Sequence, residues 1–379
     1  MARLHVTTAG PTTITVDGRD LIAFGGCNYL GLSHHPQVIA ALTDGAARYG
    51  ISTTASRETT GNTQAHDDLE RDLARWMGQQ SAILAAEGYT ANIALAQALA
   101  RTHGVALMDA RAHRSLRSAA TAAGMQVFEY EHLNADAAAS LAAMFADQGV
   151  AILTDGVFAA DGAIAPLPDL LAALPPQRAT LVVDDCHGVC VLGERGSGTV
   201  EHYGLRDPRI VITTTLAKGV GCYGGAIIGP RTVVDAVREY ADVYRRSTPV
   251  PPPLACAARA AVALVQNDPA LLASLRRNTD HLRDGLRDLG LCHRSDDVPI
   301  FTFTLDPAER MNDMAADLVR LGLYAPCIEY PGGPAERFFR LTVSAAHQPS
   351  QIDQLLGGLA QVSRLSLAAT PDALALPKS

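Results

Sequence analysis

The stretch Ile210-Val-Ile-Thr-Thr-Thr-Leu-Ala-Lys218-Gly-Val-Gly-Cys-Tyr-Gly-Gly225 joins a β-branched run to a cluster of glycines. The run predicts a buried strand at about 209–214, and the glycines predict a tight turn after it. Of the 31 lysine and arginine residues in the chain, only Lys218 and Lys378 are lysines. A lysine amine can be neutralised by burial and can form a Schiff base, whereas arginine keeps its proton. Lys218 therefore indicates amine chemistry at the end of a strand.

The composition is that of a globular protein that binds neither nucleic acid nor membrane. The 379 residues are enough for a sizeable core and more than one domain, and 48% of them are hydrophobic. The formal net charge of −8 gives no basic surface for nucleic acid or anionic lipid. The apolar stretches at 150–154 and 181–183 are too short to span a bilayer, and the N-terminus has no apolar signal region. We therefore expect a cytoplasmic protein.

The seven cysteines are scattered along the chain without paired CxxC spacing, so no disulfide framework is expected. Cys186-His-Gly-Val-Cys190 is the one candidate metal cluster. No second pair of ligands follows it at a spacing typical of zinc sites. We therefore expect no metal.

Short apolar runs alternate with alanine-rich helical segments through the middle of the chain. This alternation predicts an α/β fold with a mainly parallel sheet covered by helices on both faces. The segment 225–229 follows the lysine turn too closely for an intervening helix, so we expect it to be an antiparallel strand. The predicted strands of the alternating region lie at about 82–85, 105–109, 126–129, 150–154, 180–184 and 209–214.

The two ends of the chain predict smaller units. Residues 11–24 read as a hairpin about Asp17-Gly18. Residues 290–363 read as a small α+β unit, with strands near 299–304 and 338–343 and helices near 308–322 and 348–362. Further helices are predicted at about 36–49, 65–77 and 231–246, with two more within 254–289. We expect an N-terminal segment over 1–45, a large domain over 46–250, a small C-terminal domain over 251–363 and a tail over 364–379.

A second motif, Leu181-Val-Val-Asp184-Asp185-Cys-His187-Gly188, places an acid at the carboxyl end of a predicted parallel strand. Ligands of open α/β sheets bind at that end. Alone, Asp184 would read as a loop cap and His187 as a structural histidine, but a strand-end lysine about 30 residues later favours a shared site. The pattern Gly219-x-Gly221-x-x-Gly224 matches a dinucleotide fingerprint, but it precedes a strand instead of opening a helix, so we reject that reading.

Five motifs follow one another along the chain. They are Asn28-Tyr-Leu-Gly-Leu32, Asp155-Gly-Val-Phe-x-x-Asp161-Gly162, Val183-Asp184-Asp-x-His187-Gly, Thr215-Leu-x-Lys218-Gly and Arg340-Leu-Thr-Val-Ser-Ala-Ala-His347. With these motifs, the chain resembles the pyridoxal-phosphate (PLP)-dependent α-oxoamine synthases over roughly residues 25–363. That family includes 8-amino-7-oxononanoate synthase, 5-aminolevulinate synthase, 2-amino-3-ketobutyrate ligase and serine palmitoyltransferase. The resemblance implies the fold-type I, aspartate aminotransferase-like architecture with PLP as cofactor.

The resemblance implies roles around the cofactor ring. Lys218 would hold PLP as a Schiff base and later move the Cα proton. Asp184 would pair with the pyridinium nitrogen, which keeps the ring an electron sink. His187 would reach the phenolic oxygen of the ring, and His113 would stack on the ring. His187 and His113 could also donate to developing oxyanions.

The resemblance also implies binding groups for the phosphate and the substrate. Backbone amides of Gly88 and Tyr89 at a helix start, together with the Thr215 hydroxyl, would hold the phosphate. Thr248 would reach the phosphate from a second subunit, with Ser247 as the alternative ligand, which implies a homodimer with a shared active site. Arg340 would bind the amino-acid carboxylate through two parallel hydrogen bonds. Asn28 would lie beside that substrate.

The reaction implied is condensation of an amino acid with an acyl thioester, carried by coenzyme A or a carrier protein, with loss of carbon dioxide to give an α-amino ketone. Two alternatives stay open. One is another PLP reaction at the same site, such as transamination, retro-aldol cleavage or elimination. The other is a catalytically idle scaffold subunit, against which the retention of Lys218, Asp184 and His187 argues.

Several positions depart from the family pattern. Cys27 replaces an asparagine, Ala159 replaces a serine that contacts the ring oxygen, and the N-terminus is about one helix shorter. Glu87 stands beside the expected phosphate site, where a carboxylate is awkward unless it points away or has a cationic partner. Glu329 stands in a loop that borders the acyl pocket in relatives. These departures predict a specialised member with an unusual amino acid or acyl donor.

Overall fold

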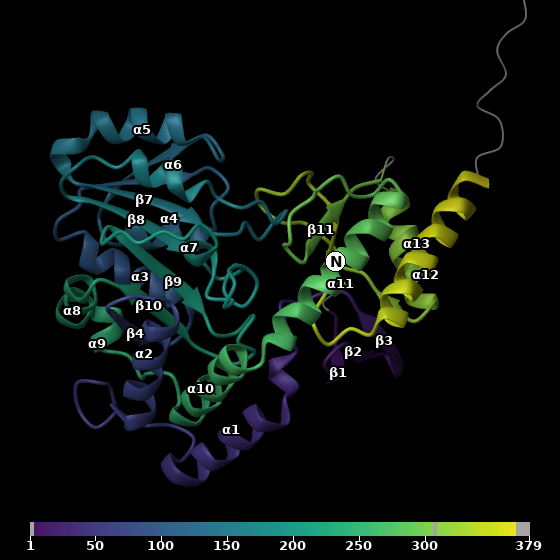
Figure 1. The fold of residues 1–379 in the computed structure, drawn as a ribbon, viewed down its shortest axis with the longest axis horizontal. Helices are drawn as coiled ribbons and strands as arrows, with labels where there is room; N and C mark the ends of the chain where they lie inside the picture. Colours follow the sequence, from purple (N-terminus) through teal and green to yellow (C-terminus); the bar gives the residue numbers. More distant parts are fainter. Residues whose placement is uncertain (1–3, 306–308, 369–379) are drawn as a thin grey trace, which may run out of the picture.

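The computed structural model describes residues 4–305 and 309–368. A seven-stranded sheet forms the larger body of the molecule, with strand order β4-β10-β9-β8-β7-β5-β6 (Figure 1). Only β10 runs antiparallel, and it pairs with both β4 and β9. The mainly parallel sheet and the antiparallel strand after the lysine turn are therefore confirmed. The strands are β4 (Ser81–Ala85), β5 (Val105–Asp109), β6 (Gln126–Tyr130), β7 (Val150–Asp155), β8 (Ala179–Asp184), β9 (Ile210–Thr215) and β10 (Gly225–Gly229).

Helices flank this sheet, as the alternating pattern predicts. α3 packs on α4 and on α8; α3 and α8 lie beside β4 and β10, whereas α4 lies beside β5 and β6. α5 lies along β5, β6 and β7. α2 packs on β4 and on α10, and α10 in turn packs on α1. The helices of this body are α1 (Pro36–Tyr49), α2 (Gln64–Trp76), α3 (Gly88–Leu99), α4 (Arg114–Ala122), α5 (Ala135–Met144), α6 (Leu167–Ala172), α7 (Thr199–His202), α8 (Arg231–Tyr240), α9 (Asp242–Arg245) and α10 (Pro252–Asn267), with short 3-10 turns η1 (Leu32–His34) and η2 (Ala146–Gln148).

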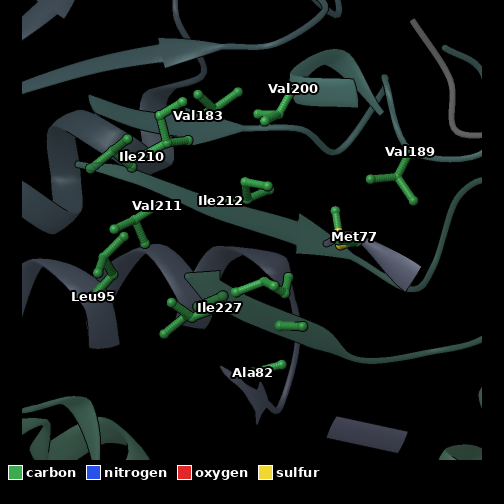
Figure 2. Close-up of a cluster of buried hydrophobic side chains, with 14 of the residues drawn as sticks. Met77, Ala82, Leu95, Val183, Val189, Val200, Ile210, Val211, Ile212 and Ile227 are labelled. Atoms are coloured by element: carbon green, nitrogen blue, oxygen red, sulfur yellow. The ribbon is translucent and has the colours of Figure 1, made fainter. Parts of the chain in front are cut away.

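The central strands are buried on both faces, which explains their continuous apolar sequence. All six residues of β7 and of β8 are buried. Side chains of β8, β9 and β10, including Val183, Ile212 and Ile227, pack with Leu95 of α3 in the cluster drawn in Figure 2. This packing fixes the register of β8 and β9, in which Asp184 pairs with Thr213. The sheet therefore sets where each strand-end side chain lies.

A second body holds the C-terminal elements. Its three-stranded sheet has the order β11-β14-β13, built from β11 (Ile300–Phe303), β13 (Cys327–Ile328) and β14 (Phe338–Thr342). α11 (Pro269–Asp288) joins the two bodies, and α12 (Glu309–Arg320) and α13 (Pro349–Ala368) pack against each other beside the small sheet (Figure 1). The predicted small α+β unit is thus present.

The N-terminal strands belong with the C-terminal body. β1 (Val6–Ala9), β2 (Thr13–Val16) and β3 (Arg19–Ala23) form a sheet with β12 (Leu323–Tyr324). Asp17 and Gly18 have φ values of 50° and 73°, so they form the predicted hairpin turn between β2 and β3. The chain then crosses to the larger body through η1 and α1.

Three boundaries differ from the sequence prediction. The helix predicted over 231–246 is two helices, because Ala241 has an extended ψ of 100° and separates α8 from α9. α13 continues through 364–368, which we predicted to be tail, while 369–379 lies outside the described residues. The boundary between the two hydrophobic cores lies within α11 and not at residue 251. Leu272 and Leu275 pack in the larger core, whereas Leu282 and Leu286 pack in the smaller one. Within the described residues, no helix is long and apolar enough to cross a membrane.

Candidate active site

The strand-end residues meet in one cavity at the carboxyl edge of the large sheet. The cavity has a volume of about 230 Å³. Its position at this edge follows from the parallel strand order, since all carboxyl ends of parallel strands point the same way. The residues that line it are Glu87, Gly88, Tyr89, His113, Ser115, Asp155, Val157, Ala159, Asp184, Cys186, His187, Thr215 and Lys218. Seven of the ten residues predicted for the site therefore lie together.

Asp184 is the last residue of β8 and forms part of the cavity wall. Its Oδ2 accepts a hydrogen bond from Asn92 Nδ2 at 2.8 Å, and its Oδ1 accepts one from the Cys186 backbone amide at 3.2 Å. Asn92 Oδ1 in turn accepts from the Thr213 hydroxyl at 2.6 Å. The Asn92 amide therefore fixes one oxygen of the carboxylate in a buried position.

Asp155 is a second carboxyl group in the same wall, at the end of β7. The His113 backbone amide donates to its Oδ1 at 3.0 Å. Burial and the neighbouring Asp184 raise the pKa of Asp155 well above its ordinary value. Asp155 opens one of the five motifs of the family resemblance, but the sequence predicts no role for it.

Lys218 follows β9 and extends its amine toward His187. The distance between Lys218 Nζ and His187 Nε2 is 2.7 Å. On the other side of the imidazole ring, Nδ1 lies 2.7 Å from the hydroxyl of Tyr29. Burial, with the Lys218 charge next, lowers the pKa of His187 well below its ordinary value. The ring is therefore neutral at neutral pH.

His113 is the N-cap of α4, which places its ring at the cavity. Its Nδ1 lies 2.7 Å from the Ser115 hydroxyl and also accepts from the Ser115 backbone amide. Its ring meets that of Tyr89 edge-on, with centroids 6.5 Å apart. Burial lowers the pKa of His113, with Lys218 adding to the effect and Asp184 opposing it. A neutral aromatic ring thus lies at the cavity.

The N-terminus of α3 reaches the cavity at Gly88, beside Thr215. A Cβ added to Gly88 would lie 3.0 Å from the Thr215 Cβ, so only glycine allows this close approach. The amides of this helix start are already engaged. Glu87 accepts from the Tyr89 and Thr90 backbone amides at 2.8 and 2.7 Å, as an N-cap. Glu87 thus points into the expected phosphate site and not away from it.

The other predicted site residues lie outside this cavity. Arg340 of β14 lies beside the cavity, because its Nε donates a hydrogen bond of 2.6 Å to the backbone carbonyl of Ala159 in the cavity lining. Its Nη2 atom is buried and finds no hydrogen-bond partner within the described residues. Asn28 lines a neighbouring cavity, and its side-chain amide donates to the Ser33 hydroxyl at 2.8 Å. Thr248 is exposed after α9, and Ser247 donates to the Val243 carbonyl.

A second, larger cavity of about 610 Å³ adjoins the first through His113, Asp155 and Ala159. Arg111, Arg114 and Arg117 line it. The loop residues Tyr330, Pro331 and Gly332 of the smaller body close its other side. This cavity therefore lies between the two bodies and adjoins the Lys218 cavity.

Comparison with known proteins gives the family. A family model described as aminotransferase class I and II matches residues 19–359. The chain belongs to the class I and II aminotransferase family. The 8-amino-7-oxononanoate synthase of Thioalkalivibrio sulfidiphilus is 37% identical over 347 residues, which covers 91% of this chain and 88% of the relative. The corresponding protein of Pseudomonas aeruginosa (strain LESB58) is 36% identical over 356 residues, with coverage of 93% and 88%.

Solved structures of serine palmitoyltransferases have the same fold as this chain. The serine palmitoyltransferase of Sphingomonas wittichii has a TM-score of 0.90 at 27% identity, covering 96% of this chain and 92% of that one. A serine palmitoyltransferase from S. paucimobilis with a bound PLP–myriocin aldimine has a TM-score of 0.90 at 25% identity, with coverage of 96% and 93%. The resemblance to α-oxoamine synthases and the fold-type I architecture are therefore confirmed.

The residues of this aminotransferase-family cavity fit PLP in all but one respect. The cavity is lined by the Lys218 amine, the buried Asp184 carboxylate, the neutral His113 ring and the N-terminus of α3 at Gly88. The exception is Glu87, whose carboxylate holds the amides that a phosphate would need. Among the described residues, no group of three His, Cys, Asp or Glu side chains could hold a metal ion.

Four residues of the site have no role predicted from the sequence: Asp155, Tyr29, Asn92 and Ser115. Asp155 and Tyr29 lie inside motifs of the family resemblance, and that position was a usable signal. Asn92 and Ser115 gave no signal, because each lies within an ordinary helical segment. Their roles depend on α3 and α4 packing side by side, and only the folded chain shows that contact.

Proposed function

We propose that this chain is a PLP-dependent C-acyltransferase that condenses an amino acid with an acyl thioester. The observation that carries the proposal is the shared cavity of Lys218, Asp184, His187 and His113 in a chain 37% identical to an 8-amino-7-oxononanoate synthase. A bond forms between the amino-acid Cα and the acyl carbon, the thiol leaves and the carboxylate departs as carbon dioxide. The product is an α-amino ketone.

Each side chain has a defined task in this proposal. PLP, when bound, withdraws electrons from the Cα of the amino acid. Lys218 binds the cofactor, removes the Cα proton and later returns a proton. Asp184, held by Asn92, would face the ring nitrogen of bound PLP. His113 would lie against the ring and exclude water from that side.

Arg340 supports recognition of the amino-acid carboxylate. Its buried Nη2 has no hydrogen-bond partner among the described residues, and a buried guanidinium nitrogen without a partner is costly unless a ligand supplies one. Asn28 lies in the neighbouring cavity, where its side chain donates to Ser33, and its contact with the substrate stays a prediction.

Arg111 and Arg117 of the adjoining cavity are ion-paired with Asp161 and Glu129, and Arg114 adds a further positive charge. This charge supports an anionic thioester donor, as coenzyme A and a phosphopantetheine carrier both are.

We also propose a homodimer. Thr248 is exposed and does not line the cavity of its own chain, so it is free to reach the phosphate of a second copy. Tyr89 lines the cavity and is 41% exposed, so a partner subunit could cover it. Light scattering of the purified protein measures the subunit number, and Thr248→Ala should weaken PLP binding. The cytoplasmic location expected from the sequence stays a prediction.

The proposal is tested in two stages. The purified protein with PLP should show the absorbance band of a Schiff base that borohydride bleaches and that Lys218→Ala lacks. If the protein with added PLP showed no such band, it would be a scaffold that does not form the Schiff base. A screen of single amino acids should then show Cα-proton exchange, and an acyl-CoA or acyl-carrier donor should release a thiol. Formation of pyridoxamine phosphate and a keto acid without thiol release would identify transamination.

A further inference from the structure

A hydrogen-bonded network connects two side chains of the Lys218 cavity, His113 and Asp184. The Asn92 side chain donates from Nδ2 to Asp184 Oδ2 at 2.8 Å and to the Ser115 hydroxyl at 2.9 Å. That hydroxyl lies 2.7 Å from His113 Nδ1. We infer that Ser115 is a positioning residue that holds the His113 ring as the tautomer with its proton on Nε2. The inference rests on the proposed function and deepens it, because it assigns a task to a further residue of the same site.

The backbone amide of Ser115 decides which nitrogen of His113 carries the proton. A backbone N–H can only donate, and this one donates to His113 Nδ1 at 3.3 Å, so the imidazole caps the N-terminus of its own helix α4. Nδ1 is therefore an acceptor and carries no proton. A neutral imidazole then has its single proton on Nε2. The same contact disfavours an imidazolium, which would direct a second N–H at the Ser115 amide.

Asn92 fixes the direction of the Ser115 hydroxyl from the other side. The Thr213 hydroxyl donates to Asn92 Oδ1 at 2.6 Å, so the amide nitrogen is the end that faces Asp184. The opposite orientation would bring two acceptor oxygens together. The Ser115 oxygen thus accepts one hydrogen of Asn92 Nδ2, and its own O–H is directed at His113 Nδ1. Asn92 and Ser115 are 3% and 1% exposed, so water does not compete for these bonds.

The tautomer determines what His113 can do in the active site. Its ring lines both the Lys218 cavity and the larger cavity beside it. Because Nδ1 is bound to the start of α4, the Nε2–H group is the polar group that the ring offers to a ligand. His113 is then a hydrogen-bond donor and not a base. In the proposed reaction the Cα proton therefore goes to Lys218 and not to His113.

Ser115→Ala removes the hydroxyl and keeps the backbone amide, and the exposed Ser140→Ala in α5 is the matched control. The first measurement is the ¹⁵N NMR signal of the His113 ring in the protein without PLP. We expect one dominant tautomer, protonated at Nε2, in the wild type and in Ser140→Ala. In Ser115→Ala the share of the other tautomer should rise several-fold, whereas Ser115→Thr, which keeps the hydroxyl, should retain the wild-type ratio. A wild-type ring protonated at Nδ1, or an unchanged ratio in Ser115→Ala, overturns the inference.

The second measurement follows the protein loaded with PLP. PLP is achiral, so circular dichroism in its absorbance band reports how the protein fixes the ring. The dichroism per bound PLP should change in Ser115→Ala and not in Ser140→Ala. Equal values in the two variants overturn the link between Ser115 and the cofactor. Because the NMR experiment needs no cofactor, a protein that binds no PLP would contradict the proposed function while the tautomer of His113 is still decided.

Discussion

Asp155 and Asp184 lie opposite each other at the carboxyl ends of β7 and β8, where the strand register pairs them directly. Both side chains are buried, at 4% exposure each. Two adjacent buried carboxyl groups resist carrying two negative charges. Burial, and next the charge of Asp184, accordingly raise the pKa of Asp155. Asp155 is thus the carboxyl group of the pair that favours its proton, whereas Asp184 accepts hydrogen bonds from Asn92 and from the Cys186 backbone amide.

This pair makes stability depend on pH. The folded protein holds a proton on Asp155 that the unfolded chain releases at the ordinary carboxyl pKa. Stability should therefore fall as the pH rises from that ordinary value through the raised folded pKa. In Asp155→Asn this fall should be smaller, while the exposed Asp44→Asn should behave as wild type. Urea unfolding of the PLP-free proteins is measured between pH 4 and pH 8, in steps of about one pH unit. The quantity compared is the change in the free energy of unfolding with pH. Equal slopes in all three would contradict the assignment.

Asn92 should matter for cofactor binding although it lies behind the cavity wall. Asn92→Ala removes the donor to Asp184 Oδ2 and leaves a buried carboxylate oxygen without a partner. Loss of such a bond costs about 1–3 kcal/mol, or roughly ten-fold or more in PLP affinity. A PLP titration followed by absorbance measures it, with the exposed Asn267→Ala as control. Equal affinities in the two variants would show that Asp184 needs no support from Asn92.

Glu87 should oppose the cofactor phosphate. Its carboxylate holds the Tyr89 and Thr90 amides and must release them when a phosphate binds there. Glu87→Ser keeps an N-cap side chain and removes the charge, so we expect PLP to bind on the order of ten-fold more tightly, since like charges near a protein surface repel by a few kcal/mol. The exposed Glu239→Gln is the control. Weaker PLP binding by Glu87→Ser would mean that the carboxylate assists the cofactor.

Arg340 should set the affinity for the amino acid. Arg340→Lys keeps the charge but loses the planar fork that binds a carboxylate through two bonds. With about 1.5–3 kcal/mol for a charged hydrogen bond, KM for the amino acid should rise on the order of ten- to a hundred-fold. The exposed Arg320→Lys should leave KM unchanged. A rise in the KM of the thioester alone would place Arg340 at the other substrate.

Ile212 tests the core that fixes the strand register. Its side chain is 1% exposed between β8 and β10 in the cluster of Figure 2. Ile212→Ala should lower the free energy of unfolding by about 2–5 kcal/mol, and Ile212→Val by about 0.5–1.5 kcal/mol. Urea unfolding measures both. A loss below about 1 kcal/mol for Ile212→Ala would mean that the site collapses around the cavity, since the cost depends on such relaxation.

Several details depended on contacts between segments distant in sequence. Periodicity could not show the break at Ala241, because the apolar positions of α8 continue toward α9 without a proline or glycine between them. Asn92 reaches Asp184 only because α3 packs beside β9. Glu87 was recognised as a misfit from its charge, but its bonds to the Tyr89 and Thr90 amides depend on the local backbone geometry of the α3 N-terminus.

The sequence by itself determined the alternating strands, the antiparallel strand after the lysine turn, and Lys218, Asp184, His187 and His113 as residues of one site. It could do so because buried parallel strands are continuous apolar runs and their carboxyl ends share one edge. Only the tertiary structure decided that the Tyr29 hydroxyl reaches His187, that Asn28 lies in a neighbouring cavity, and that a buried nitrogen of Arg340 has no hydrogen-bond partner among the described residues. Those outcomes depend on side-chain directions and on the packing of the N-terminal segment against two bodies, which no local pattern encodes.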